Sequence, residues 1–267
     1  MTGVLGEMAI ETVGAVDIVA LNRPGRLNAL TAEMIADLTA YFRAAVDRAE
    51  TRVIMLRGEG RGFCAGIDLE RENEGTVQGS IPGMYRVQES LSDLVLAMRR
   101  CPQPIIALVH GAAAGGGFAL ALACDVRLAT PAARFIPSFV KIGLSAGDCG
   151  LSYFLPRLVG RAAAAQIMLA GQTVDAARAV ALGLVAELVD EDRMPDAGMA
   201  LAREMLGASP MGLRMTKDLI NLNADAPSLE AALALENRTQ VLLGQTDDLR
   251  EGVAAFLEKR HPDYRGR

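Results

Sequence analysis

The sequence predicts an α/β fold, in which a core of alternating strands and helices is followed by a region of helices alone. Short β-branched runs such as 53–56 and 105–109 predict buried strands, and apolar residues at helical spacing follow them. From about Met194 onward only helical patterns remain. We therefore expect a core over 1–193 and a helical region over 194–267, packed on the core because no Pro- or Ser-rich linker separates them.

The N-terminal part of the chain predicts a hairpin, a helix and a strand in that order. Residues 9–12 and 16–21 flank a short Gly-containing turn, which is typical of an antiparallel hairpin. Thr31 is a favoured N-cap residue, and apolar residues between Met34 and Val46 then fall on one helical face. The strand 53–56 follows, and four glycines lie between Gly58 and Gly66. The polar, glycine-containing segment 70–83 predicts a loop, and the helix 85–100 comes after it.

The second half of the core is organised around the stretch 104–125. Its strand, 105–109, is followed by three consecutive glycines, 115–117, and then by a helix of small apolar residues. A strand over 125–130 and an extended piece over 131–135 come next. The segment 135–160 is irregular and becomes helical from about Gly150. Helices that end at Gly171 and Gly183, a strand over 185–189 and the C-terminal helices, including 229–243 and 248–259, complete the prediction.

Composition and charge exclude several classes of protein. The net charge is −5, from 32 acidic and 27 basic residues. The sequence contains no basic helix or polybasic run, so we expect no nucleic acid as a partner. The longest apolar run, 111–124, is too short to span a membrane. The N-terminus has no signal-peptide pattern, so we expect a cytoplasmic protein. Four cysteines without metal-ligand spacing and two histidines argue against a metal site.

Both glycine-rich turns come directly after a predicted buried strand. A strand, a glycine turn and a helix together present backbone N–H groups at the helix N-terminus, where a ligand oxygen can approach them. Two such turns at neighbouring strand ends would place two N–H groups around one oxygen. The alternative is that the glycines only allow the helix to pack closely on the sheet.

Five motifs occur in an order that resembles the crotonase superfamily, the enoyl-CoA hydratases and isomerases. They are NRPGRLNAL, GRGFCAGIDL, PIIALVHGAAAGGGFALALACDVRLA, LPRLVG and REGVAAFLEKRHPDY. The resemblance runs nearly end to end. It implies a spiral of ββα units that stacks two sheets, and a C-terminal helical region that forms homotrimers or dimers of trimers. It also implies an acyl-CoA substrate, an enolate of its thioester as the stabilised species, and no cofactor beyond the coenzyme A of the substrate.

The resemblance assigns roles to individual positions. It implies that the oxyanion is held by the backbone N–H groups of Ile67 and Gly116. It also implies a coenzyme A site on the first two motifs, with Lys259 reaching a phosphate in a neighbouring subunit. For Arg26 and Lys259 a solvated surface charge is the alternative. The residues that this likeness places at the coenzyme A site are Arg26, Leu27, Asn28, Ala65, Gly66 and Asp68.

The chain departs from the family at the two glutamates that hydratases use. Ala119 and Phe139 occupy these positions, in the substrate pocket, and neither can accept a proton. One acid, Asp148, lies nearby, at a place where some isomerases of the family carry an aspartate. A carboxylate enclosed by Phe139, Tyr153 and Phe154 would be desolvated, which favours a base. The alternative is that Asp148 only caps the helix at 151–158.

We therefore expect an acyl-CoA isomerase in which Asp148 moves one proton. A hydratase that uses Asp148 with a loop glutamate is the second hypothesis, and a non-catalytic acyl-CoA-binding subunit is the third. The remaining polar residues have structural explanations. We expect His110 and Cys149 to be buried in the core, Asp68 and Asp125 to close turns, and the loop glutamates at 70, 72 and 74 to be solvated.

Overall fold

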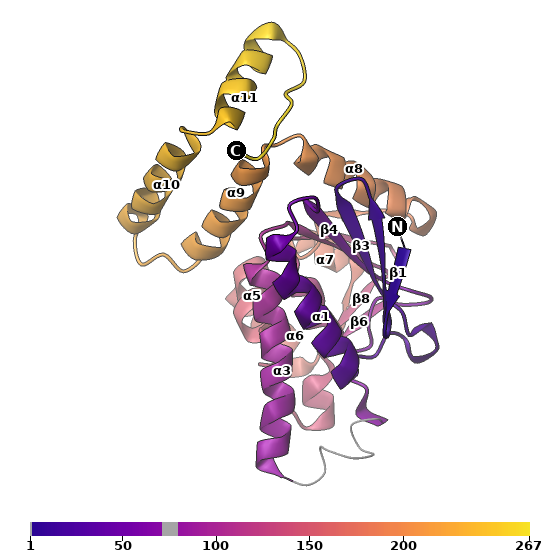
Figure 1. Cartoon of the computed structure of the whole chain (residues 1–267). Coiled ribbons are helices and arrows are strands. Elements are labelled where there is room, and N and C mark those ends of the chain that lie inside the picture. Colours follow the sequence, from indigo (N-terminus) through magenta and orange to yellow (C-terminus); the bar gives the residue numbers. More distant parts are fainter. Residues whose placement is uncertain (1, 71–79) are drawn as a thin grey trace.

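The computed structural model describes residues 2–70 and 80–267 and contains two β-sheets with helices around them (Figure 1). The larger sheet has seven strands in the order β1-β2-β3-β4-β5-β7-β10, and the smaller has the order β6-β8-β9. This is the mixed α/β architecture that the sequence predicts. The predicted loop glutamates 72 and 74 lie outside the described residues.

The seven-stranded sheet is antiparallel at its N-terminal edge and parallel from β3 onward. The predicted hairpin is confirmed as β2 and β3, while β1 was not predicted and β10 is shorter than the expected strand. Strand β5, central to the sequence pattern, is buried at every residue and lies between β4 and β7. The strands are β1 Thr2–Leu5, β2 Met8–Val13, β3 Val16–Leu21, β4 Val53–Gly58, β5 Ile105–Val109, β7 Val126–Ala129 and β10 Glu187–Leu188.

The small sheet begins where the chain leaves β5. Gly111 has φ +55°, and a Cβ there would lie 2.3 Å from the carbonyl oxygen of Arg61, so glycine is required at this bend. The chain then forms β6, which pairs in parallel with β8, and β8 pairs with β9. The three strands are β6 Ala112–Ala114, β8 Arg134–Ile136 and β9 Val174–Asp175. The sequence predicted only β8, as an extended piece.

Six helices with described bounds accompany the core. Thr31 caps α1 as predicted, because its side chain accepts a hydrogen bond from Met34 N at 3.1 Å. Helix α3 begins earlier than predicted, since Ser80 caps it by accepting from Gly83 N. Helices α1 and α3 lie side by side (Figure 1), and every residue of α4 is buried. The helices are α1 Ala32–Ala44, α3 Ile81–Arg100, α4 Gly116–Ala123, α5 Leu151–Val159, α6 Arg161–Ala170 and α7 Ala176–Ala181.

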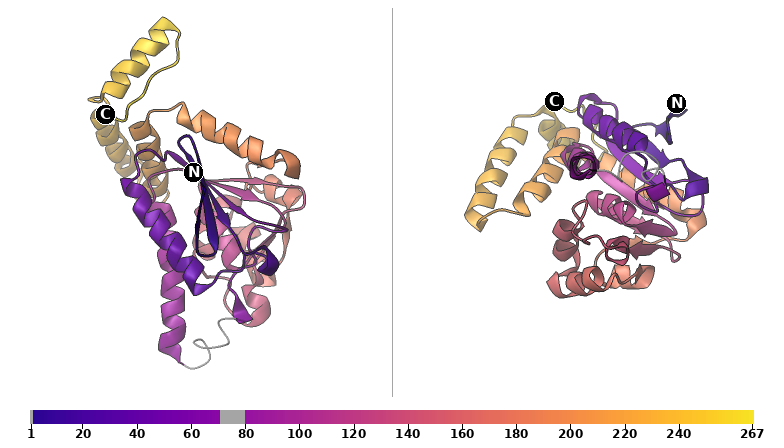
Figure 2. Two further views of the ribbon diagram at one scale, coloured as in Figure 1. Left: turned by 45° about the vertical axis from the view of Figure 1, so that its right-hand side comes forward. Right: turned by 90° about the horizontal axis from the view of Figure 1, so that it is seen from below.

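The chain from Met194 onward forms four helices, which confirms the helical region predicted there. Helix α8 packs on the sheet, and a Cβ on its Gly198 would meet the side chains of Met55 and Leu108 at about 3 Å. Helix α9 is anchored by the buried Lys217, whose Nζ lies 2.8 Å from both Asp125 Oδ2 and Gln103 O. Helices α10 and α11 extend away from the sheets (Figure 2). The bounds are α8 Met194–Leu206, α9 Pro210–Asn223, α10 Leu229–Leu243 and α11 Asp247–Glu258.

None of the helices within the described residues combines the length and the hydropathy that a membrane span requires. The division of the chain between 193 and 194 remains a prediction. Helix α8, which follows this point, shares a cluster of buried apolar residues with the strands of the larger sheet.

Candidate active site

The two glycine-rich turns predicted from the sequence lie directly against each other. Cys64 N donates to Ala112 O at 3.0 Å, and Ala114 N donates to Cys64 O at 2.9 Å, so the two segments pair like short parallel strands. A Cβ on Gly66, which has φ +96°, would lie 2.8 Å from Ala114 O and 3.3 Å from Gly116 N. The amide of Gly116 is therefore adjacent to the turn that contains Ile67.

The N–H groups of Ile67 and Gly116 have no backbone acceptor within the described part of the chain. On one side of each, the adjacent amide is bonded: Asp68 N donates to Leu30 O, and Gly115 N donates to Ile136 O, both at 2.9 Å. Gly116 opens α4, and amides in the first turn of a helix have no intrahelical partner. Two free N–H groups thus occur in two turns that touch.

Close packing explains two of the glycines but not Gly116. A Cβ on Gly117 would lie 2.3 Å from Cys64 O, and one on Gly66 would clash with Ala114 O, so both turns need glycine to approach each other. A Cβ on Gly116 would meet nothing closer than Leu30 Cδ1, at 3.5 Å, which is an ordinary contact distance. The packing alternative is therefore correct for Gly66 and Gly117, and it leaves Gly116 without a packing reason to be glycine.

The two positions where hydratases carry glutamate are apolar and buried here. Ala119 lies on α4 with no exposed surface, and Phe139 is 4% exposed. A Cβ on Gly115 would lie 3.7 Å from the Phe139 ring, so this ring packs over the glycine turn. Neither position provides a group that can activate water.

Asp148 is half-buried in the loop before α5, and its carboxylate is held by the next residue. Asp148 Oδ1 accepts from Cys149 N at 2.7 Å and from the Cys149 thiol at 3.3 Å. The alternative role as a helix cap is wrong, because α5 is capped by Gly150 and no side chain bonds to its first turn. Only the carbonyl of Asp148 accepts from that helix, from Leu151 N at 2.8 Å.

The two aromatic residues of α5 that we expected beside Asp148 contact other groups. The Tyr153 hydroxyl donates to Asp225, and the Arg99 guanidinium lies 5.4 Å from the Phe154 ring centroid. Both rings line a cavity of about 400 Å³ to which Asp148 does not contribute. Of the three aromatic residues that we expected to enclose the Asp148 carboxylate, only the buried Phe139 is still a candidate for this role.

The predicted coenzyme A residues lie partly in the first glycine-rich turn and partly in the loop that packs against it. The Arg26 side chain is half-exposed and pairs with Asp68 at 3.6 Å and with Glu70, and the hydrogen bond to Glu70 is the main reason that the pKa of Arg26 is raised. Leu27 and Asn28 both have positive φ, and Leu27 O accepts from Ala65 N at 2.9 Å.

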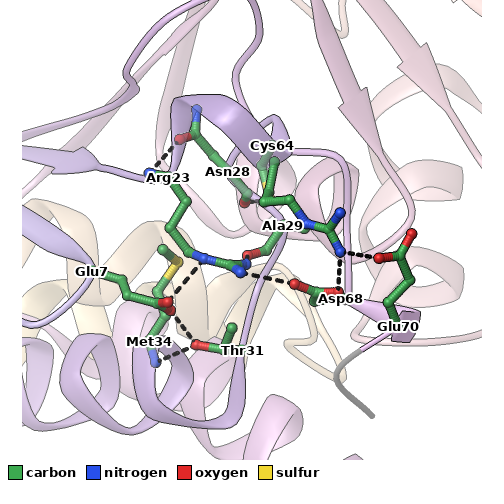
Figure 3. Close-up of polar contacts among 10 residues, drawn as sticks. Glu7, Arg23, Asn28, Ala29, Thr31, Met34, Cys64, Asp68 and Glu70 are labelled. Atoms are coloured by element: carbon green, nitrogen blue, oxygen red, sulfur yellow. Dashed lines mark hydrogen bonds and ion pairs between the residues drawn. The ribbon is translucent and has the colours of Figure 1, made fainter. Parts of the chain in front are cut away.

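Asn28 has a structural role that the sequence did not reveal. It is fully buried, and its Nδ2 donates to the carbonyl oxygens of Glu59 and Gly62, each at 2.8 Å. Its amide oxygen accepts from Arg23 N at 2.9 Å (Figure 3). The side chain of Asn28 therefore holds the first glycine-rich turn in place and has no surface open to a ligand.

Arg23 is the residue that sequence reasoning missed. Its guanidinium lies 2.9 Å from Asp68 Oδ2 and 2.9 Å from Glu7 Oε1, and it donates to Ala29 O (Figure 3). It thus ties the turn between β1 and β2 to the residue that follows Ile67. Because 45 positions separate Arg23 from Asp68, no local pattern in the sequence could have paired them.

Of the remaining predicted residues, His110 contacts the first glycine-rich turn, whereas Lys259 and Asp125 belong to other parts of the chain. Lys259 is exposed at the end of α11, the helix that extends from the core (Figure 1). His110 is half-buried, so the expectation that it lies in the core is wrong, and its Nε2 lies 2.9 Å from Gly60 O. Asp125 accepts from Ile105 N as a structural group. Within 2–70 and 80–267, no group of three or more His, Cys, Asp or Glu side chains could hold a metal ion.

Comparison with known proteins places this chain in a family. The family model described as enoyl-CoA hydratase/isomerase matches residues 11–267. The chain is 39% identical over 249 residues to 1,2-epoxyphenylacetyl-CoA isomerase of Escherichia coli K12, covering 92% of this chain and 94% of that protein. It is 38% identical over 251 residues to a probable enoyl-CoA hydratase of Mycobacterium leprae, covering 92% of this chain and 85% of the relative.

A solved structure agrees with the sequence matches. The crystal structure of an enoyl-CoA hydratase from Polaromonas sp. JS666 superimposes with a TM-score of 0.91 at 34% identity, covering 97% of this chain and 100% of that one. The two sheets and the C-terminal helices therefore form a crotonase-like fold. The chain is an enzyme that belongs to the enoyl-CoA hydratase/isomerase family.

Proposed function

We propose that this enzyme moves a carbon–carbon double bond in an enoyl-CoA thioester, with Asp148 as the single base. The observation that supports this most directly is the contact between the two glycine turns, which brings the free amide of Gly116 beside the turn of Ile67. Two N–H donors placed in this way can stabilise a thioester oxygen that becomes negative when a proton leaves the acyl chain. Removal of one such donor typically costs about 3–4 kcal/mol of transition-state stabilisation.

In this mechanism Asp148 removes a proton from one carbon of the acyl chain and returns it to another. The electron pair of the broken C–H bond passes into the enolate, whose oxygen accepts hydrogen bonds from Ile67 and Gly116 N–H. When the proton is returned, the electrons reform a C=C bond at the new position. One carboxylate suffices, which agrees with the apolar residues at Ala119 and Phe139.

Hydration is the second candidate, supported by the relatives that are named hydratases. It requires a group that activates water, and Asp148 would have to do this together with a loop glutamate. Glu70, the loop glutamate within the described residues, is engaged by Arg26. A subunit that binds acyl-CoA without turnover is the third candidate.

The substrate itself supplies the coenzyme A, and the proposed reaction needs no other cofactor. Arg26 is the candidate cation for the nucleotide end, because its half-exposed guanidinium can exchange Glu70 for a phosphate oxygen. Ala65, Gly66 and Leu27 would provide backbone contacts beside it. We further propose that the chain works as a homo-oligomer, a trimer or a dimer of trimers, in which Lys259 reaches a neighbouring site.

The proposal is tested by the turnover of a 3-enoyl-CoA and a 2-enoyl-CoA by the wild type and by Asp148→Asn. Absorbance of the conjugated thioester follows both reactions. We expect wild-type isomerisation, and a loss of kcat on the order of 10²–10⁴-fold in the variant, the usual contribution of a positioned base. Asp192→Asn, which changes an exposed aspartate in the turn before α8, is the matched control and should keep full activity.

Two results would contradict the proposal. Hydration without isomerisation, preserved in Asp148→Asn, would favour the hydratase with another acid. Tight thioester binding without turnover of either substrate would favour the binding subunit.

A further inference from the structure

We propose that Cys149 is a positioning residue for Asp148, whose carboxylate it orients through its thiol and its backbone amide. This inference rests on the proposed role of Asp148 as the base. It concerns a residue that sequence reasoning assigned only to the core. Its basis is that Cys149 donates two hydrogen bonds to Oδ1 of Asp148.

The two donors reach the same oxygen. Cys149 N lies 2.7 Å from Asp148 Oδ1, and Cys149 Sγ lies 3.3 Å from it. Two donors on one oxygen determine the rotation of a carboxylate about its last torsion, which is otherwise broad. For Oδ2, no donor is recorded within the described ranges, so the second oxygen is left to act on a substrate proton.

The thiol remains a donor over the pH range in which enzymes are assayed. Burial raises the pKa of the Cys149 thiol strongly, and the adjacent Asp148 charge raises it further. The side chain is 7% exposed, so solvent does not compete for the bond. An S–H group is a weak donor, and it therefore orients the carboxylate while stabilising the charged form less than a hydroxyl would.

The backbone conformation at Cys149 indicates that its side chain has a role that glycine could not fill. Its φ is +48°, a left-handed conformation in which glycine is favoured, and glycine follows it directly at Gly150. Glycine would satisfy this geometry without strain and would still provide the amide donor. What glycine cannot provide is the second donor to Asp148 Oδ1.

The test compares Cys149→Ala, Cys149→Ser and Cys149→Gly in the isomerase assay. A misplaced base lowers the rate of the chemical step more than it weakens substrate binding. We therefore expect kcat to fall about 10-fold in the alanine and glycine variants, with KM changed less than about 2-fold. Serine replaces the thiol by a hydroxyl donor and should recover kcat to within about 3-fold of the wild type.

The matched control is Cys124→Ala, which removes another buried thiol, bonded to the carbonyl of Leu120 at 3.4 Å. This variant should retain kcat. A readout without substrate is the infrared S–H stretching band of Cys149, assigned by its loss in Cys149→Ser. The band should shift in Asp148→Ala because the thiol loses its charged acceptor.

The outcomes separate this inference from the proposed function. Full kcat in Cys149→Ala, or a serine variant as slow as the alanine variant, would overturn the positioning role while Asp148→Asn stays inactive. An S–H band that does not move in Asp148→Ala would also overturn it. Full activity in Asp148→Asn would overturn the proposed function, and the role of Cys149 with it.

Discussion

Arg23 shows, at the scale of a single residue, how a side chain can fix the position of a site without taking part in its chemistry. Its guanidinium joins Asp68, Glu7 and Ala29 O, and the Asp68 side chain is only 4% exposed. Asp68 directly follows Ile67, so the ion pair limits how far the proposed oxyanion amide can move. Breaking a buried pair leaves an uncompensated charge, which is costly.

Arg23→Ala is therefore expected to destabilise the protein by about 3 kcal/mol and to lower kcat of the isomerase reaction. Urea denaturation gives the free energy of unfolding. The matched control is Arg43→Ala, which breaks the exposed pair with Asp93 and should cost less than about 1 kcal/mol. Equal losses in the two variants would show that Arg23 makes no special contribution to this turn.

Residue types could be predicted from the sequence here, but their partners could not. The glycines of both turns were identified because a glycine pattern is local. The pairing of Arg23 with Asp68 and the burial of Asn28 depend on contacts between distant segments. The same holds for Tyr153, whose contact with Asp225 on the chain after α9 replaced the expected contact with Asp148.

At the scale of elements, the accuracy of the prediction followed the length of the pattern. Strand β5 and helix α10 were predicted with the correct bounds, since each has a sustained apolar pattern and clear flanking residues. Strands β6 and β9 have three and two residues, too few to show a period. They exist because the turn at Gly111 brings β6 beside β8, a contact that only the fold creates.

The C-terminal tail after α11 provides a pH-dependent contact at the same scale. Glu251 accepts from Arg260 and from Asp263 N, and the Arg260 hydrogen bond is the main reason that the pKa of Glu251 is lowered to about 2 from its ordinary 4.5. A lowered folded-state pKa stabilises the contact fully above about pH 4.5. This stabilisation is lost as the pH falls through about 2.

We therefore expect the tail to loosen progressively between about pH 4.5 and 2. Hydrogen exchange at the Asp263 amide, corrected for the intrinsic pH dependence of exchange, measures this opening. In Glu251→Gln the tail should already be loose at pH 6, and its corrected exchange should not change across that range. A wild-type tail that stays protected at pH 2 would show that other contacts dominate.

The whole molecule consists of a well-packed core and a helical extension with an incompletely covered surface. Phe256 and Leu257 on α11 are 82% and 74% exposed, and Val241 and Leu242 on α10 are 67% and 62% exposed. Large exposed apolar side chains of this kind mark interaction surfaces. The extension in Figure 2 therefore suits contact with further copies of the chain, as proposed above.

Phe256→Asp tests this at the scale of the assembly, because a buried carboxylate without a partner opposes association. We expect the wild type to sediment as a homo-oligomer and the variant to sediment mainly as a folded monomer with an unchanged circular dichroism spectrum. If Lys259 serves a neighbouring subunit, the variant should also lose affinity for the acyl-CoA. Leu169→Asp, the same change at an equally exposed position on α6, is the control and should leave the mass unchanged. A Phe256→Asp protein with the wild-type mass would exclude α11 as the interface, and Lys259 would then remain a surface charge.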